Sequence, residues 1–300
     1  MEPILLRDFI PCAALQSFVR KYQVFRFTFE KNISPPIKFH TPRPEHSITF
    51  YVRDPQKFSH VNSCDIRTYS QCVINGVYTV PLNRHGGHDF CAIKVVLQPT
   101  TLSRLNILSV KELNNNYVNT EECLGKHISL LCEQLIQMTE LKKMIDTIEC
   151  FLIQLLHKKC KPLEAIDKAS QYLIQQERDV PLNWLANQSC LSVRQFIRRF
   201  EKQVGVSPKT FQKLVRFDRA YRLKNNDPNK DWLYIALACG YYDYQHLAKD
   251  FKKFTQLTPP AFYEIERTSP ERSFACMKVK ECHFFTTNNI LDLGRFTEHN

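Results

Sequence analysis

The chain has 300 residues, of which 43% are hydrophobic and 24% are charged, and its formal net charge is +11. Proportions of this kind belong to folded globular proteins and exclude a largely disordered chain, and the length suffices for two domains. The basic surplus is shared by both halves of the chain, so it predicts an anionic partner, such as nucleic acid, an acidic membrane or an acidic protein, without locating the site.

Neither export nor a membrane span is expected from the sequence. The segment Met1 to Phe9 carries charged residues and lacks the apolar core of a signal peptide. No run of about 18 apolar residues occurs, so no transmembrane helix is predicted. The 12 cysteines include no CxxC pair, which argues against the common zinc and thioredoxin motifs. We therefore expect a cytoplasmic protein with free, mostly buried thiols, and neither a metal nor another cofactor.

Residues 1–125 predict a β-rich region. Runs of β-branched and aromatic residues at 48–52, 69–80 and 90–97 are bounded by turn residues, as short strands usually are. The pair Asn75-Gly76 lies inside the second run and is a strong hairpin signal. We expect two strands to pair around it, within a fold compatible with a small barrel.

The pattern changes to a helical period over residues 127–158. Apolar residues recur there at spacings of three, four and seven, which predicts one helix, or two helices broken near Thr139-Glu140. This stripe can pack on the sheet or form a dimer seam, and the two roles can coexist. A basic stretch at 157–162 predicts a domain boundary. The predicted divisions are a β-rich regulatory or dimerisation domain with C-terminal helices at 1–160, a helical domain at 161–267, and a tail at 268–300 with a strand at 274–286.

An internal repeat lies within the helical region. Residues 192–211 align with residues 243–262 at an offset of 51, which matches Phe200 with Phe251. Upstream of these segments the offset is 50, as between Leu185 and Ile235. The second copy therefore has one extra residue in its turn.

Each copy of the repeat predicts a short helix, a turn and a second helix. The turn carries a small residue, Cys190 or Gly240, where a positive φ is often needed. Ser192 or Asp243 then supplies the N-cap oxygen of the second helix. A Ser-Pro or Thr-Pro pair after each copy starts a further helix. The helix between the copies is expected at 208–224, and Arg216 within it is expected to be structural or to face a phosphate.

This arrangement is a helix-turn-helix whose second helix exposes a polar face. In both copies that face is rich in Arg, Lys and Gln. Arg and Gln can pair bidentately with guanine and adenine in the major groove, whereas Lys and His suit phosphates. Solvated faces of ordinary helices are the alternative, but two such copies in sequence favour DNA binding.

At these residues the chain resembles the AraC/XylS family of bacterial transcription regulators. The stretches that carry the resemblance are LNWLANQSCLSVRQFIRRFEKQVGVSPKTF and IALACGYYDYQHLAKDFKKFTQLTPPAFY, within about residues 165–265. Two positions depart from the family: Cys190 stands where glycine is common, and Ile197, at a position that is often polar, can touch a thymine methyl group. The resemblance implies base-facing positions at Arg194, Ile197 and Arg198 in the first unit and at Tyr244, Gln245, Ala248 and Lys249 in the second, with His246 near the DNA backbone.

The sequence therefore predicts an α+β protein: a β-rich N-terminal domain with flanking helices, followed by an all-α domain of two helix-turn-helix units joined by a linker helix. Its expected function is sequence-specific binding of double-stranded DNA as a bacterial transcription regulator, with RNA polymerase, a small-molecule effector and a second copy of the chain as further partners. The candidate DNA-binding residues are Arg194, Gln195, Ile197, Arg198, Lys202, Tyr244, Gln245, His246, Ala248, Lys249 and Lys252.

Two other functions stay open at this point. The N-terminal domain can be a ligand- or partner-sensing module whose readout is DNA binding, or the chain can be a cysteine-based DNA-repair protein with the same DNA-binding unit. Redox sensing is a related option for Cys64, Cys72 and Cys91. His85 and His88 with Asp89 can supply metal ligands, but a polar loop is favoured there. No motif of a common enzyme class occurs, so no enzymatic activity is expected.

Overall fold

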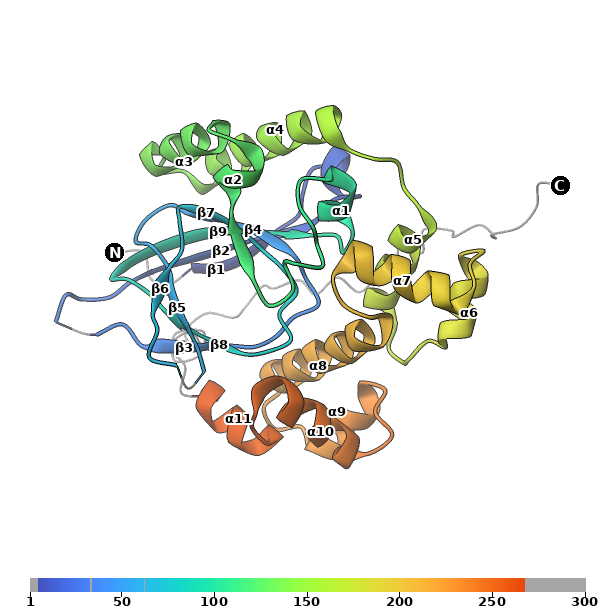
Figure 1. Ribbon diagram of the computed structural model, residues 1–300. Helices are drawn as coiled ribbons and strands as arrows, with labels where there is room; N and C mark the ends of the chain where they lie inside the picture. Colours follow the sequence, from blue (N-terminus) through green and yellow to red (C-terminus); the bar gives the residue numbers. More distant parts are fainter. Residues whose placement is uncertain (1–4, 33, 62, 268–300) are drawn as a thin grey trace.

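The computed structural model describes residues 5–267 apart from residues 33 and 62. The chain forms an α+β fold in which a β-rich region precedes a helical region (Figure 1). The predicted tail at 268–300, including its strand at 274–286, lies outside the described residues. None of the helices in the described part combines the length and the apolar character that crossing a bilayer requires.

Two antiparallel sheets form the β-rich region. The larger sheet has six strands in the order β1-β2-β9-β4-β7-β10, and the smaller has four in the order β3-β8-β5-β6. The strands of the larger sheet are β1 (Leu5–Phe9), β2 (Val19–Thr28), β4 (Ser47–Tyr51), β7 (Cys72–Asn75), β9 (Asp89–Leu97) and β10 (Tyr117–Asn119). The strands of the smaller sheet are β3 (Ile37–His40), β5 (Lys57–His60), β6 (Arg67–Thr68) and β8 (Leu82–His85).

Strands β4, β7 and β9 of the larger sheet are buried on both faces. Alternate side chains of a strand point to opposite faces, and on β9 Ile93 packs toward the helices while its neighbour Ala92 packs among aromatic residues next to the smaller sheet. Two helices, α3 (His127–Gln137) and α4 (Leu141–Lys159), cover one face of the larger sheet. Three shorter helices precede them in the chain: η1 (Ala13–Leu15), α1 (Thr101–Leu105) and α2 (Thr120–Leu124).

The apolar stripe predicted at residues 127–158 belongs to the core. Leu131 and Leu135 on α3, and Ile148 and Leu152 on α4, are buried in one cluster with the sheet. The break between α3 and α4 falls at the predicted Thr139-Glu140. The structure thus confirms the packing interpretation, and a dimer seam on these helices stays a prediction.

The predicted hairpin at Asn75-Gly76 is wrong. Strand β7 ends at Asn75 and pairs with β4 and β10, whereas the next strand, β8, lies in the other sheet. Gly76 instead lets two backbones approach, because an added Cβ would lie 1.9 Å from the carbonyl oxygen of Leu113. The close approach, and not a tight turn, explains the glycine.

The helical region is built around one apolar core that spans both copies of the repeat. Its largest fully buried side chains are phenylalanines, and Phe217 on the linker helix contacts the rings of Phe251 and Phe254. The helices are α5 (Ala165–Gln175), α6 (Leu182–Gln188), α7 (Val193–Val204), α8 (Pro208–Asn226), α9 (Trp232–Ala238), α10 (Tyr244–Thr255) and α11 (Pro259–Arg267). The predicted linker helix is α8.

The two regions contact each other directly. The ring centroids of Phe39 and Phe262 lie 5.9 Å apart, and Lys38 Nζ lies 3.2 Å from a carboxylate oxygen of Glu266. Arg104 donates a hydrogen bond to the carbonyl of Lys161 at 3.1 Å. A domain division at residue 160 stays a prediction, and it would separate elements that pack against one another.

Candidate nucleic-acid interface

The turn of the first unit has a positive φ, as the repeat predicted. Cys190 lies between α6 and α7 and has a φ of 52°, a value that residues other than glycine seldom adopt. The amide of Leu191 donates to the carbonyl of Ala186 at 3.0 Å and closes the turn. Ser192 then caps α7, because its hydroxyl accepts the amide hydrogen of Gln195 at 3.3 Å. This geometry fixes the direction in which α7 leaves the turn.

The second unit repeats that geometry with other residues. Gly240 has a φ of 77°, and the amide of Tyr241 donates to the carbonyl of Ala236 at 2.9 Å. Asp243 caps α10 by accepting the amide hydrogen of His246 at 2.8 Å. This hydrogen bond holds the pKa of Asp243 below its usual range.

Both second helices are amphipathic in the same register. Phe196 and Phe200 on α7, and Leu247 and Phe251 on α10, are fully buried and lie four residues apart in each pair. Each helix ends on a residue with a left-handed conformation, Gly205 or Gln256. The remaining faces point away from the core and are strongly cationic.

Most of the candidate residues lie on these outward faces. The exposed candidates of the first unit are Arg194, Gln195, Arg198 and Lys202, and those of the second are Gln245, His246, Lys249 and Lys252. The half-buried candidates are Ile197, Tyr244 and Ala248. Arg199 and Lys253 are also exposed and add to the positive charge of the two faces. Their role in DNA binding stays a prediction.

Two of the exposed candidates also make local hydrogen bonds. The amide oxygen of Gln195 accepts the backbone N–H of Ser192 at 3.1 Å and completes a capping box. His246 Nδ1 lies 2.9 Å from a carboxylate oxygen of Asp243. Both side chains are therefore held at the first turn of their helix.

The linker helix holds the two units together through Arg216. Its guanidinium lies 2.7 Å from Asp179, which precedes α6, and 3.4 Å from Asp250 on α10. It also lies over the ring of Tyr241, 4.6 Å from the centroid. Lys213 adds an ion pair with Asp250 at 3.5 Å. Of the two predicted roles of Arg216, the structural one accounts for these contacts.

Helix α7 borders the β-rich region. Arg198 and Lys202 line a hollow of about 590 Å³ together with residues 106–111. At the end of α7, an added Cβ on Gly205 would lie 2.9 Å from the carbonyl oxygen of Val110. Lys111 is exposed in the same hollow. No signal in the sequence marks Lys111, because it becomes a neighbour of α7 only through the packing of the two regions.

The histidines and cysteines that were considered as metal ligands or redox sensors belong to the β-rich region and not to the two helix-turn-helix units. His85 contacts the hydroxyl of Ser59 at 3.2 Å, and His88 contacts the carbonyl of Glu30 at 3.2 Å. In the described ranges, no three His, Cys, Asp or Glu side chains are grouped as metal ligands would be. Burial raises the pKa of the thiols of Cys72 and Cys91, which disfavours the reactive thiolate.

Known proteins resemble the part of the chain that holds the two units. Residues 185–264 match a family model described as a helix-turn-helix domain. The chain is 35% identical over 91 residues to an uncharacterized HTH-type transcriptional regulator of Haemophilus influenzae, a match that covers 30% of each protein. It is 31% identical over 98 residues to the HTH-type transcriptional regulator MtrA of Neisseria gonorrhoeae, which covers 31% of this chain and 32% of MtrA.

The matched segment therefore spans less than a third of the length of these curated relatives. A solved structure, ToxT from Vibrio cholerae, aligns with 81% of this chain and 97% of its own, at a TM-score of 0.46 and 12% identity.

Proposed function

From the premise that residues 185–264 form a helix-turn-helix domain of the AraC type, we propose that the whole chain is a bacterial transcription regulator that binds double-stranded DNA at specific sequences. The observation that carries the proposal is the repetition itself. Two units with the same turn geometry present cationic helices, α7 and α10, on a single shared core. A single cationic helix is common on the solvated surface of a protein. Two such helices held on one core suit a ligand whose grooves repeat at regular intervals, as those of duplex DNA do.

In the proposed complex α7 and α10 enter successive segments of the major groove, about 34 Å apart along the duplex. Arg194 and Arg198 read bases from α7, and Lys249 does so from α10, while Lys202 and Lys252 neutralise phosphates. The ion pairs of Arg216 with Asp179 and Asp250 keep the relative angle of the units fixed. A rigid pair engages both grooves by bending the DNA, at a cost on the order of 1–6 kcal/mol.

Substitutions at Arg198 and Lys252 test the two proposed kinds of contact. Arg198→Ala is expected to lose roughly 1–3 kcal/mol of binding free energy on the chain's own operator and to relax the preference at one base pair. Lys252→Ala is expected to weaken binding to all sequences alike and to lower the salt slope by about one. Gel shifts at several salt concentrations measure both effects.

Lys142→Ala is the matched control, because Lys142 is an exposed lysine on α4, in the β-rich region. It should leave affinity and salt slope as in the wild type. Unchanged binding in both Arg198→Ala and Lys252→Ala would overturn the proposed docking.

The further partners belong to the same proposal. Such a regulator acts in the bacterial cytoplasm with RNA polymerase, responds to a small effector and binds DNA as a homodimer, and it needs no catalytic group of its own. The exposed Leu130 on α3, 57% accessible, is a position where a second copy would bury apolar surface. Analytical ultracentrifugation of the wild type and of Leu130→Glu tests the dimer: a wild-type monomer at micromolar concentration would contradict it.

A further inference from the structure

The β-rich region places a turn of the chain against the C-terminal end of helix α7. In this turn the amide of Glu112 donates a hydrogen bond to the carbonyl of Ser109 at 3.2 Å. Val110 is buried, and its carbonyl oxygen would lie 2.9 Å from a Cβ added to Gly205 at the end of α7. Lys111 follows directly and is exposed. The packing of Val110 therefore brings an exposed lysine of the β-rich region next to α7.

The hollow between this turn and α7 is cationic. Lys111 lines it from the β-rich region, and Arg198 and Lys202 line it from α7. In the part of the chain that the structure describes, none of these three side chains forms an ion pair with a carboxylate. Glu201 is the one acidic residue among those that line the hollow, and Glu112 is not one of them. The surplus of positive charge suits an anionic ligand.

Contacts of helix α1 hold the turn in place beside α7. Asn106 caps the C-terminal end of α1, and its side-chain oxygen accepts a hydrogen bond from Lys161 Nζ at 3.1 Å. On the same helix Arg104 lies 4.0 Å from the carboxylate of Asp167, a buried residue of α5. Helix α5 in turn shares the apolar core of α7. These contacts fix the position of the turn, and so of Lys111, relative to α7.

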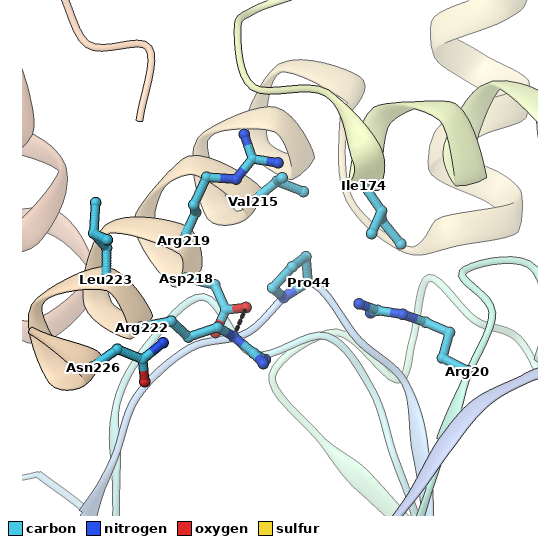
Figure 2. Close-up of a pocket in the computed structure, with 9 residues that line it drawn as sticks. All are labelled: Arg20, Pro44, Ile174, Val215, Asp218, Arg219, Arg222, Leu223 and Asn226. Atoms are coloured by element: carbon cyan, nitrogen blue, oxygen red, sulfur yellow. Dashed lines mark hydrogen bonds and ion pairs between the residues drawn. The ribbon is translucent and has the colours of Figure 1, made fainter. Parts of the chain in front are cut away.

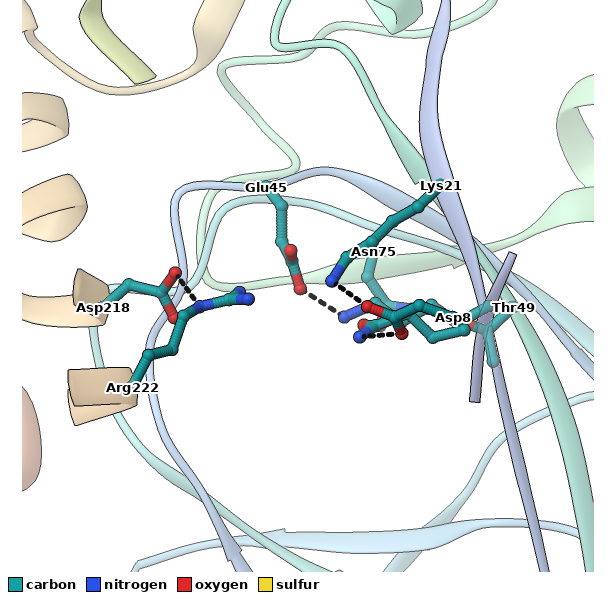
Figure 3. A network of polar contacts seen from close by, with 9 residues as sticks. Asp8, Lys21, Glu45, Thr49, Asn75, Asp218 and Arg222 are labelled. Carbon is teal, nitrogen blue, oxygen red and sulfur yellow. Dashed lines mark hydrogen bonds and ion pairs between the residues drawn. The ribbon is translucent and has the colours of Figure 1, made fainter. Parts of the chain in front are cut away.

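A second set of contacts joins the two regions at the linker helix. Arg222 and Asp218 of α8 form an ion pair at 2.7 Å, on the side of the helix that faces Arg20 of the β-rich region (Figure 2). Glu45 lies between this ion pair and the polar side chains of the sheet (Figure 3). The carboxylate of Asp218, and to a smaller extent that of Glu45, raises the pKa of Arg222 above its usual value, although burial lowers it. Arg222 is thus attracted by carboxylates of both regions, which opposes a rotation of one region against the other.

The place of the hollow along α7 matches the path of the DNA backbone in the proposed complex. A recognition helix contacts base edges mainly with its N-terminal residues, so its C-terminal turns lie closer to the sugar-phosphate strand at the edge of the groove. The hollow lies beside the C-terminal half of α7, where Lys202 follows Arg198 by about one turn. A phosphate in the hollow would be flanked by Lys202 on one side and Lys111 on the other.

We propose that the hollow receives the sugar-phosphate backbone of the duplex that α7 reads, and that Lys111 is a phosphate contact supplied by the β-rich region. The inference rests on the proposed function, since it requires α7 to enter the major groove. Lysine suits this role because its ammonium group is a point charge on a flexible stem, which neutralises a phosphate without selecting a base. The β-rich region therefore adds affinity for DNA but no base preference.

The test measures how salt affects DNA binding by the full chain. Duplexes that bind the wild type are selected from a random library and used as probes. Lys111→Ala should make the slope of log association constant against log salt concentration shallower by about 0.9, the value for one phosphate contact. At about 0.1 M salt this corresponds to a roughly eightfold loss of affinity. Selection repeated with Lys111→Ala should return the same sequences, because no base contact is lost.

Two variants control for the charge. Lys142→Ala removes one positive charge from an exposed position on α4 that does not line the hollow, and it should keep the wild-type slope. Lys111→Arg keeps the charge in the hollow and should also keep the slope. Phosphate ethylation interference then locates the contact. The phosphate whose ethylation inhibits the wild type but not Lys111→Ala should adjoin the one identified in the same way with Lys202→Ala.

The outcomes separate this inference from the proposed function. A selection that yields no duplex overturns both. If Lys202→Ala lowers the slope but Lys111→Ala, folded by circular dichroism, binds with the wild-type slope, only the contact from the β-rich region is overturned. Tighter binding by Lys111→Ala also overturns it, since the turn would then shield α7 from the duplex.

Discussion

The two helix-turn-helix units reach the same backbone geometry with different residues. A positive φ is carried by Cys190 in one turn and by Gly240 in the other, and the cap oxygen comes from Ser192 or Asp243. What repeats is therefore a set of conformational requirements and not a set of side chains. The comparison teaches that the repeat is best detected from caps, turns and apolar anchors.

The surroundings of the units differ more than their geometry. The first unit packs beside the β-rich region, with Arg198 in a hollow shared with residues 106–111. The second unit exposes apolar side chains: Leu233 and Leu237 are 49% and 57% accessible, and Tyr242 is 86% accessible. Both copies of the motif therefore contact the β-rich region, the first along α7 and the second at Phe262, and the second also exposes these three apolar side chains.

The largest expected effect tests whether the two units contribute equally to their shared core. Phe200→Ala and Phe251→Ala should each lower the free energy of unfolding by roughly 3–5 kcal/mol, because both rings are fully buried. The loss should be greater for Phe251, whose ring contacts those of Phe217, Trp232 and Phe262. Urea denaturation measures both losses.

Tyr242→Ala is the matched surface substitution in the second unit and should change stability by no more than about 0.5 kcal/mol. A loss below about 1 kcal/mol in only one of the phenylalanine variants, against the range for buried aromatic residues, would contradict the equal contribution of the two units.

Opposite changes are expected at the two turn positions. Gly240→Ala should destabilise the protein by roughly 2–4 kcal/mol, since it combines a positive φ with a Cβ that would lie 2.4 Å from the carbonyl oxygen of Glu177. Cys190→Gly should stabilise it by up to about 1 kcal/mol, because relief of the left-handed conformation exceeds the entropy cost of glycine. Thermal denaturation of both variants gives the sign, and a shift in the same direction for both would contradict the equivalence of the turns.

The smallest expected difference concerns the caps. Ser192→Ala should cost about 1 kcal/mol at any pH, because a hydroxyl cap does not titrate. The Asp243 cap should depend on pH. Its pKa is lowered in the folded state by the backbone hydrogen bond from His246, so its contribution is present above the ordinary aspartate pKa of about 3.9 and is lost as the pH falls through the lower folded value.

Asp243→Asn separates the cap from its charge, since asparagine caps helices equally well and does not titrate. The stability of the wild type relative to this variant should fall on acidification below the ordinary aspartate pKa. A difference that is independent of pH would mean that the carboxylate charge of Asp243 adds nothing to its capping role.

The helical region was predictable because its signals are local. Ser192, Asp243 and the proline at position 208 each act within one turn of their own helix, and the buried phenylalanines recur at helical spacing. The predicted break between α3 and α4 was local as well. Each of these signals is contained within one short segment, so it can be recognised in a single sequence.

The β-rich region was less predictable because strand pairing joins distant segments. Strand β2 pairs with β1 and β9 but was not identified, and Asn75-Gly76 was interpreted as a hairpin although the partners of β7 come from residues 47–51 and 117–119. The same limit applies to neighbours from different regions. Lys111 lies near α7, and Arg20 lies near α8, only because the two regions pack together. No local pattern records such neighbours.

The capping box of α7 has a consequence for how a base pair can be read. Since the oxygen of the Gln195 amide accepts the backbone N–H of Ser192, the orientation of that amide is set and its NH₂ group is the part left to face a ligand. Recognition of adenine by glutamine uses the oxygen and the nitrogen together. While the cap is intact, Gln195 therefore acts only as a donor and cannot make the bidentate contact to adenine. It can donate to N7 of either purine, to guanine O6 or to thymine O4, so the operator position opposite it should lack the preference for adenine that a bidentate glutamine confers.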